Sequence, residues 1–205
     1  MNFHKIVYRI IFLILIIPAI INGQTYISPL LAIDGTAYGI QYGIYSGTIK
    51  YATSPAYGLK VEQQLSDRFR IGLQGYFSKK FIPYKNSLHN EGNNTAPFFP
   101  IYGFRMDNYN VSIQGYFYLL DSFRIGIGPS ILSVGNFHSK WGNSENTWNK
   151  QPFPRIRQYG GLLQLGYEYH NFQLNLAYHR HVQPAFSSTL QLSLGYLIQV
   201  RGGKR

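Results

Sequence analysis

The 205-residue chain contains no cysteine, so it can form no disulfide bond, thiolate zinc site or iron–sulfur cluster. Charged residues make up only 13% of it, whereas they make up about a quarter of an ordinary soluble domain. Acidic residues are scarcer than basic ones, with 8 Asp and Glu against 19 Lys and Arg, so the net charge is +11. Aromatic residues reach 17%, which argues against disorder. This composition suits a surface that does not face water.

The chain also lacks an apolar run long enough to cross a membrane as a helix. The aliphatic stretch at residues 10–21 is about a dozen residues long, and a spanning helix needs about 20. Lys5 and Arg9 precede this stretch, and the small residue Gly23 follows it. This order predicts a signal peptide at residues 1–23, cleaved to leave a single domain at residues 24–205. The alternative is an N-terminal anchor that is retained.

From Gly35 onward, apolar and polar residues alternate with a period of two, which is typical of β-strands. Phe69, Ile71 and Leu73, for example, share one face of a segment whose other face carries Gln74. The predicted strands lie near residues 38–44, 57–65, 69–77, 109–119, 123–131, 163–169, 172–178 and 190–198.

Tight turns and long connections alternate between these strands. The predicted turns at residues 66–68, 120–122 and 170–171 each place apolar residues opposite apolar ones and polar opposite polar. The first turn, for instance, places Leu65 opposite Phe69 and Gln64 opposite Arg70. The sequence therefore predicts an antiparallel meander of eight strands.

Eight meander strands can close into an up-and-down barrel with no exposed edge. A soluble lipocalin-like barrel would place the apolar faces inside, whereas a membrane barrel places them in lipid. The apolar faces are too bulky for an eight-stranded interior, and the polar faces hold mainly Gly, Ser, Gln and Asn. Strands of 9–11 residues also suit a tilted membrane crossing. We therefore predict an all-β, eight-stranded antiparallel up-and-down transmembrane β-barrel, with a bulge near Gly126 and Gly128 to accommodate Pro129.

The sequence resembles the small eight-stranded outer-membrane barrels of Gram-negative bacteria, the OmpA/OmpX-type superfamily. The resemblance covers the mature chain and rests on the signal peptide, strand number, alternation of short and long connections, and the closing strand at residues 190–198. That strand is similar to the C-terminal assembly signal of such barrels, although it does not end on an aromatic residue. The resemblance implies the cell outer membrane, with both termini periplasmic and the long loops extracellular.

Five charged residues fall on the polar strand faces and are predicted to form a polar network in the lumen: Lys60, Glu62, Arg70, Arg124 and Glu168. Glu62 lies diagonally across the first turn from Arg70, within side-chain reach. We favour a salt-bridge network that fills the barrel, because lone buried charges are costly. A gated ion path is the alternative.

The predicted outer loops carry two kinds of candidate contact residue. Their aromatic residues are candidates for a partner interface or for packing between loops: Phe98, Phe99, Trp141 and Trp148. Their cations are candidate contacts to lipopolysaccharide: Lys79, Lys80, Lys85, Arg155, Arg157 and Arg180. We expect no nucleic-acid partner for an exported membrane protein.

We predict no catalytic residue, cofactor or metal site. Lipid A-modifying barrels place His, Ser and an acid near the outer leaflet, but no acid is well placed here beside His138, His179 or Ser187. At His179-Arg180-His181 we expect only one of the two histidines to face inward.

The favoured function is a non-enzymatic integral outer-membrane barrel that is a structural or accessory subunit of a larger outer-membrane protein complex. The alternatives are a lipid A-modifying acyl hydrolase or acyltransferase, and a narrow pore or conduit for small hydrophobic molecules.

Overall fold

The computed structural model describes residues 24–39, 49–83, 101–141, 149–150, 156–183 and 187–201, and every regular element among them is a β-strand. No helix in these ranges is long and apolar enough to span a membrane. The strands are β1 (Thr25–Gly39), β2 (Ile49–Ser66), β3 (Phe69–Pro83), β4 (Ile101–Tyr118), β5 (Phe123–Trp141), β6 (Asn149–Lys150), β7 (Ile156–Tyr169), β8 (Phe172–Gln183), β9 (Ser187–Tyr196) and β10 (Ile198–Arg201).

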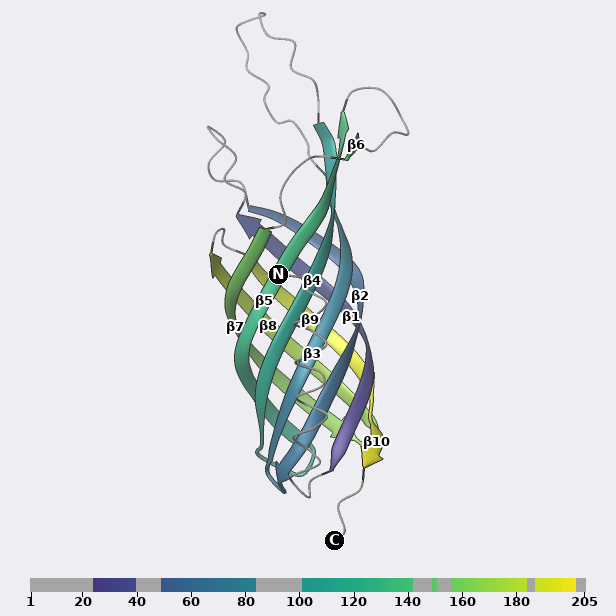
Figure 1. The fold of residues 1–205 in the computed structure, drawn as a ribbon, viewed down its shortest axis with the longest axis vertical. Coiled ribbons are helices and arrows are strands. Elements are labelled where there is room, and N and C mark those ends of the chain that lie inside the picture. The colour runs from purple at the N-terminus through teal and green to yellow at the C-terminus, as the bar shows by residue number, and fades with distance from the viewer. Residues whose placement is uncertain are drawn as a thin grey trace, which may run out of the picture.

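The strands form one closed antiparallel barrel (Figure 1). Neighbours in sequence pair with each other around the sheet, and β9 pairs with β1 through contacts such as Leu31 opposite Leu194. The barrel wall has eight strands, because β6 only extends the pairing of β5, and β10 continues β9 beyond Leu197. The predicted fold class is confirmed.

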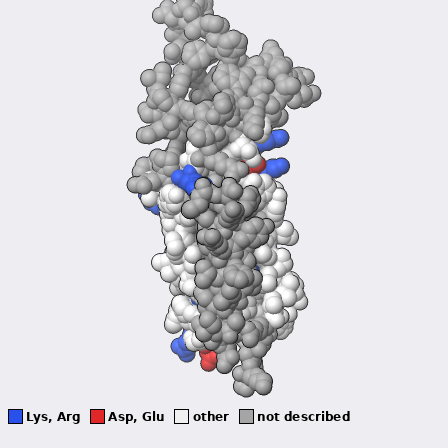
Figure 2. All heavy atoms as spheres, viewed as in Figure 1, with Lys and Arg blue, Asp and Glu red and all other residues white. Residues whose placement is uncertain are grey.

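The apolar faces of the strands point outward and the polar faces point inward. In β9, Leu192 is 50% exposed, whereas its neighbours Gln191 and Ser193 are buried. The same alternation runs along β7, where Leu163 and Leu165 are exposed and Gln164 is buried. Figure 2 shows the charged side chains near the two ends of the barrel, with a broad uncharged band between them. This inside-out pattern is that of a transmembrane β-barrel, whose wall contacts hydrocarbon.

The first strand is not where the sequence pattern placed it. We predicted residues 38–44, but β1 runs from Thr25 to Gly39 and overlaps that prediction only at its end; residues 40–44 lie outside the described residues. The alternation of apolar and polar residues in β1 is obscured because an apolar leucine lies on each face: Leu30 faces the lumen and Leu31 faces outward. Pro29 and Asp34 are also unusual in a strand.

The register agrees with most of the predicted turn pairings. Gln64 lies opposite Arg70, and Tyr169 lies opposite Phe172. The pairing of Leu65 with Phe69 is wrong, because a register shift places Ser66 opposite Phe69 instead.

Pro129 is accommodated differently from the predicted bulge. The β4–β5 pairing resumes in the same register on either side of it, from Ser112–Ser130 to Gly115–Ile127, so the ladder has a gap without an inserted residue. Proline has no N–H to donate, which explains the gap.

The tight turns lie at one end of the barrel, and the strand ends that border the long connections, such as Pro83 and Ile101, lie at the other, which we call the long-connection end (Figure 1). Thr25 in β1 pairs with Arg201 in β10, so the described chain ends at the same end as the tight turns. Residues 1–23 lie outside the described residues, and the signal peptide and its cleavage remain predictions.

Candidate functional site

Glu62 lies at the centre of a charge cluster that fills the lumen near the tight-turn end. Its carboxylate accepts from Lys60 Nζ at 2.9 Å and from Arg124 Nη1 at 2.8 Å. Arg70 Nη1 lies 3.6 Å from the second carboxylate oxygen. These residues come from β2, β3 and β5, so the cluster joins non-adjacent parts of the wall. Lys60, Glu62 and Arg124 are all fully or almost fully buried.

Glu168 on β7 is the second anion of this cluster. Arg124 Nη1 lies 2.8 Å and Arg70 Nη1 lies 3.3 Å from its carboxylate. The hydroxyl of Tyr118 donates to the same carboxylate at 2.6 Å. Gln173 on β8 donates to both Glu62 and Glu168, at 3.2 and 2.8 Å, and accepts from Lys60. The structure thus brings all five predicted lumen charges into one network.

Aromatic rings contact the cations of the cluster. Three cations face two carboxylates, and ring faces are a second source of attraction for a buried cation. The Arg124 guanidinium carbon lies 4.4 Å from the Tyr116 ring centroid, and that of Arg70 lies 4.8 Å from the Tyr118 centroid. Lys60 Nζ lies 5.4 Å from the Tyr116 centroid.

Glycines on the lumen face make room for these large side chains. A Cβ on Gly72 or Gly126 would lie 2.9 or 2.8 Å from the ring of Tyr116, which is fully buried. A Cβ on Gly166 would lie 2.7 Å from Nε of Arg124. Glycines were predicted on the polar faces, but their fit against Tyr116 and Arg124 was not. This fit depends on which strands are neighbours and on the height at which each side chain enters the lumen.

A second polar cluster lies in the half of the lumen nearer the long connections. Asp34 on β1 pairs with Lys80 and accepts from Ser54 and Ser78, each at 3.1 Å. Lys80 Nζ also donates to the backbone oxygen of Asp34 at 3.0 Å. The prediction that Lys80 contacts lipopolysaccharide is therefore corrected: its side chain faces the lumen and is 0% exposed. Asp34 was missed because the first strand was misplaced.

His179 and His181 both face the lumen, so the expectation that only one does is wrong. Residues two apart on a strand share a face, and both rings are buried and stacked, with centroids 6.2 Å apart. His179 Nδ1 lies 3.2 Å from Asn110 Nδ2. His181 lies 3.1 Å from the Ser130 hydroxyl and 3.4 Å from that of Ser187.

The histidine pair has neutral hydrogen-bond partners among the described residues. The hydrogen bonds described for His179 and His181 join them to amide and hydroxyl groups. Ser187 donates to Gln158. No group of three or more metal-ligating His, Asp or Glu side chains occurs among the described residues.

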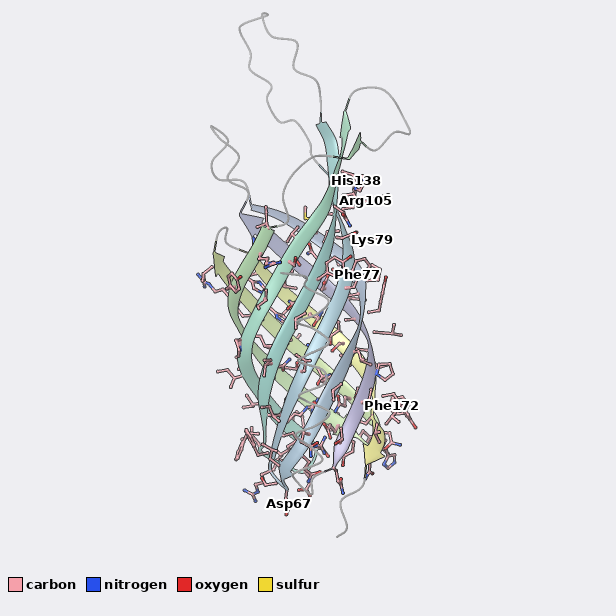
Figure 3. The ribbon with its side chains drawn as sticks, in the orientation of Figure 1. Asp67, Phe77, Lys79, Arg105, His138 and Phe172 are labelled. Carbon is pink, nitrogen blue, oxygen red and sulfur yellow. The ribbon has the colours of Figure 1, made fainter. Side chains whose placement is uncertain are left out.

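The remaining predicted contact residues fall near the long-connection end or outside the described residues. Lys79, Arg157 and Arg180 lie on the outer face of the wall and are exposed. In Figure 3, Lys79 lies near Arg105 and His138 at this end. Trp141 ends β5, its backbone opposite Ile101. Phe98, Phe99, Trp148, Lys85 and Arg155 lie outside the described residues.

Aromatic pairs line the outer wall at two levels. Nearer the tight turns, the rings of Phe172 and Tyr196 lie 5.2 Å apart. Further along the wall, Phe77 lies 5.2 Å from Tyr57 and 5.0 Å from Tyr109. Figure 3 shows that Phe77 and Phe172 are well separated along the barrel, as in the aromatic girdles of membrane barrels.

No protein-family model and no curated protein matches the sequence. Among solved structures, Ail, the attachment invasion locus protein of Yersinia pestis in complex with the heparin analogue sucrose octasulfate, matches with a TM-score of 0.53 and 13% identity, over 86% of this chain and 99% of Ail. Neisserial surface protein A matches with a TM-score of 0.47 and 13% identity, over 84% and 96%. OprG from Pseudomonas aeruginosa matches with 0.46 and 12%, over 87% and 99%. The chain has the fold of the small eight-stranded outer-membrane β-barrels.

Proposed function

We propose that the mature chain is a non-enzymatic integral outer-membrane protein with a sealed interior, which acts through its outer surface as a structural or accessory subunit of an outer-membrane assembly. The charge cluster centred on Glu62 carries this proposal. It occupies the lumen near the tight turns and bonds residues of β2, β3, β5, β7 and β8 to one another.

Opening a solute path through this cluster would separate buried ion pairs. Removing one partner of a buried pair costs about 3–5 kcal/mol, because an uncompensated charge is left behind. Glu62 contacts three cations, and Arg124 contacts two carboxylates. The resting barrel is therefore expected to be closed, which leaves the wall and the outer loops as the functional surfaces.

We propose two contact surfaces, one for lipopolysaccharide and one for a protein partner. The exposed cations Lys79, Arg157 and Arg180, with Lys85 and Arg155 in the predicted loops, suit the phosphates and acidic sugars of lipopolysaccharide. The complex of Ail with a sulfated heparin analogue supports polyanion contact on a barrel of this fold. The proposed protein interface comprises Trp141 at the end of β5 and the aromatic residues Phe98, Phe99 and Trp148.

Native purification in mild detergent, followed by mass spectrometry of co-purifying proteins, tests the subunit role. We expect the barrel to be recovered in a complex of defined composition. Recovery only as a free monomer would contradict the subunit role. Unchanged lipid A mass spectra after gene deletion are expected of a non-enzymatic barrel, and an altered acylation pattern would favour the acyltransferase alternative.

A narrow pore is the second candidate, supported by the middle of the lumen. Both amide atoms of buried Gln74, the Asn110 Oδ1 atom and the Gln164 Oε1 atom have no hydrogen-bond partner among the described residues. Buried polar groups without protein partners are usually hydrated, so this layer is suited to hold water. Planar-bilayer recordings separate the two candidates: we expect no conductance steps from the sealed barrel, and regular steps would favour the pore.

A further inference from the structure

A groove lies on the outer wall of the barrel where β5, β7 and β8 run side by side (Figure 1). It is shallow and open, with a volume of about 670 Å³. Its outward-facing lining is almost entirely apolar and comprises Ile127, Pro129, Gly161, Leu163, Tyr178 and Val182.

The groove arises from two residues that oppose each other in the β5–β7 ladder. Pro129 pairs with Gly161, so neither strand offers a long outward side chain at this position. A Cβ on Gly161 would meet only a backbone oxygen at 3.7 Å, which shows that the space above it is open. Pro129 and Gly161 thus form the floor of the groove. Ile127, which is 68% exposed, pairs with Leu163, and these two residues form one side of the groove.

The surroundings of the groove define what can occupy it. It lies in the apolar wall, so its occupant comes from the hydrocarbon layer rather than from water. Arg180 lines it and is exposed. Arg180 lies beyond Tyr178 on β8, toward the end of the barrel with the long connections. Arg180 pairs with Gly161 in the β7–β8 ladder, so its exposed side chain borders the floor of the groove. An apolar groove that is bordered by a guanidinium matches an acyl chain that is attached to a phosphate-bearing headgroup.

A second copy of the chain fits this groove poorly. In a two-fold contact each residue of the patch meets the same patch on its partner, so the two Arg180 side chains would approach each other beside the apolar wall. Like charges that approach each other in a medium of low dielectric constant repel strongly.

We propose that this groove binds one acyl chain of the lipid A part of lipopolysaccharide, and that Arg180 binds a lipid A phosphate. The proposal rests on the outer-membrane location in the proposed function, because lipid A belongs to the outer leaflet. It deepens that function by assigning the lipopolysaccharide contact to one place on the wall.

Two pairs of matched variants test the groove and the cation separately. Gly161→Leu fills the groove, and Gly75→Leu makes the same change at an outward glycine on β3 that lines another apolar groove of the wall. Arg180→Gln removes the proposed phosphate ligand, and Arg68→Gln removes an exposed cation from a tight turn at the opposite end of the barrel. Each purified variant is first checked for the heat-dependent gel shift of a folded barrel. Binding of lipid A is then titrated by native mass spectrometry in non-ionic detergent.

We expect Gly161→Leu to weaken lipid A binding by about tenfold or more, which is a ratio that such titrations resolve well. Arg180→Gln should weaken it severalfold, and dephosphorylated lipid A should bind the parent protein as weakly as it binds Arg180→Gln. Gly75→Leu and Arg68→Gln should bind lipid A as the parent protein does. Equal binding by Gly161→Leu and Gly75→Leu would overturn the proposal, and so would equal binding of phosphatidylglycerol and lipid A.

The failure of this proposal is distinguishable from the failure of the proposed function. If lipid A binding is indifferent to Gly161→Leu while the barrel is still recovered from outer membranes in a complex, only the groove assignment fails. If the barrel is absent from outer membranes, the proposed function fails.

Discussion

The ring of Tyr116 lies so close to Gly126 on the neighbouring strand that a Cβ added to this glycine would be 2.8 Å from two of the ring carbons. The contact places a large aromatic side chain in a narrow lumen, where its face also meets the guanidinium of Arg124. The charge cluster therefore depends on a residue that has no side chain.

Gly126→Ala is expected to destabilise the barrel by about 1–3 kcal/mol, because overpacking a filled interior forces its neighbours to move. The measurement is the free energy of unfolding in urea, with the protein in lipid vesicles. Gly75→Ala is the control, since its Cβ would meet nothing within 4 Å. Equal stability of the two variants would contradict the close fit around Tyr116.

Glu62→Gln is expected to cost about 3–5 kcal/mol of unfolding free energy, because Lys60 and Arg124 remain buried beside a neutral amide. The double variant Glu62→Gln, Lys60→Met should recover part of this loss, because it removes one of the buried positive charges that Glu62→Gln leaves without a carboxylate partner. Asp67→Asn serves as the control, since Asp67 lies exposed in a tight turn. A loss below about 1 kcal/mol for Glu62→Gln, as at an exposed ion pair, would contradict the buried network.

Lys79 and Lys80 are expected to differ sharply in chemical reactivity. Lys79 is exposed on the outer face, whereas Lys80 is buried and paired with Asp34. A water-soluble amine-reactive reagent applied to the folded barrel should modify Lys79 and leave Lys80 unmodified, as read by peptide mass spectrometry. Both should react after unfolding, and rapid modification of Lys80 in the folded state would disprove its lumen position.

Leu192→Arg is expected to destabilise the folded barrel by about 2–4 kcal/mol, the range for arginine at the middle of the bilayer. Val200→Arg on β10, close to the end with the tight turns, should cost only about 0–1 kcal/mol. Both parent residues are exposed on the outer wall, at 50% and 60%. Unfolding in lipid vesicles measures both values, and equal costs would contradict the placement of the hydrocarbon layer around the centre of the wall.

Much of the architecture could be predicted because its cause is local. Alternation with a period of two identifies a strand, and the bulk of one face identifies the side that meets lipid, as Leu163 and Gln164 illustrate. The tight turns fix the register of their strands, which is why Gln64 opposite Arg70 was predictable. The prediction failed at β1, where Leu30 faces the lumen and Leu31 faces outward although both are leucine, so hydropathy does not distinguish the two faces there.

The sequence by itself determined an eight-stranded transmembrane barrel and the outward face of most strands after the first, because both follow from side chains that are near one another along the chain. Only the tertiary structure decided the partners inside the lumen. Asp34 with Lys80, Glu62 with Arg124 and Tyr116 with Gly126 each join residues far apart in sequence. The tilt of the strands and the closure of β9 on β1 set the height at which each side chain enters the lumen, and no local pattern encodes that height.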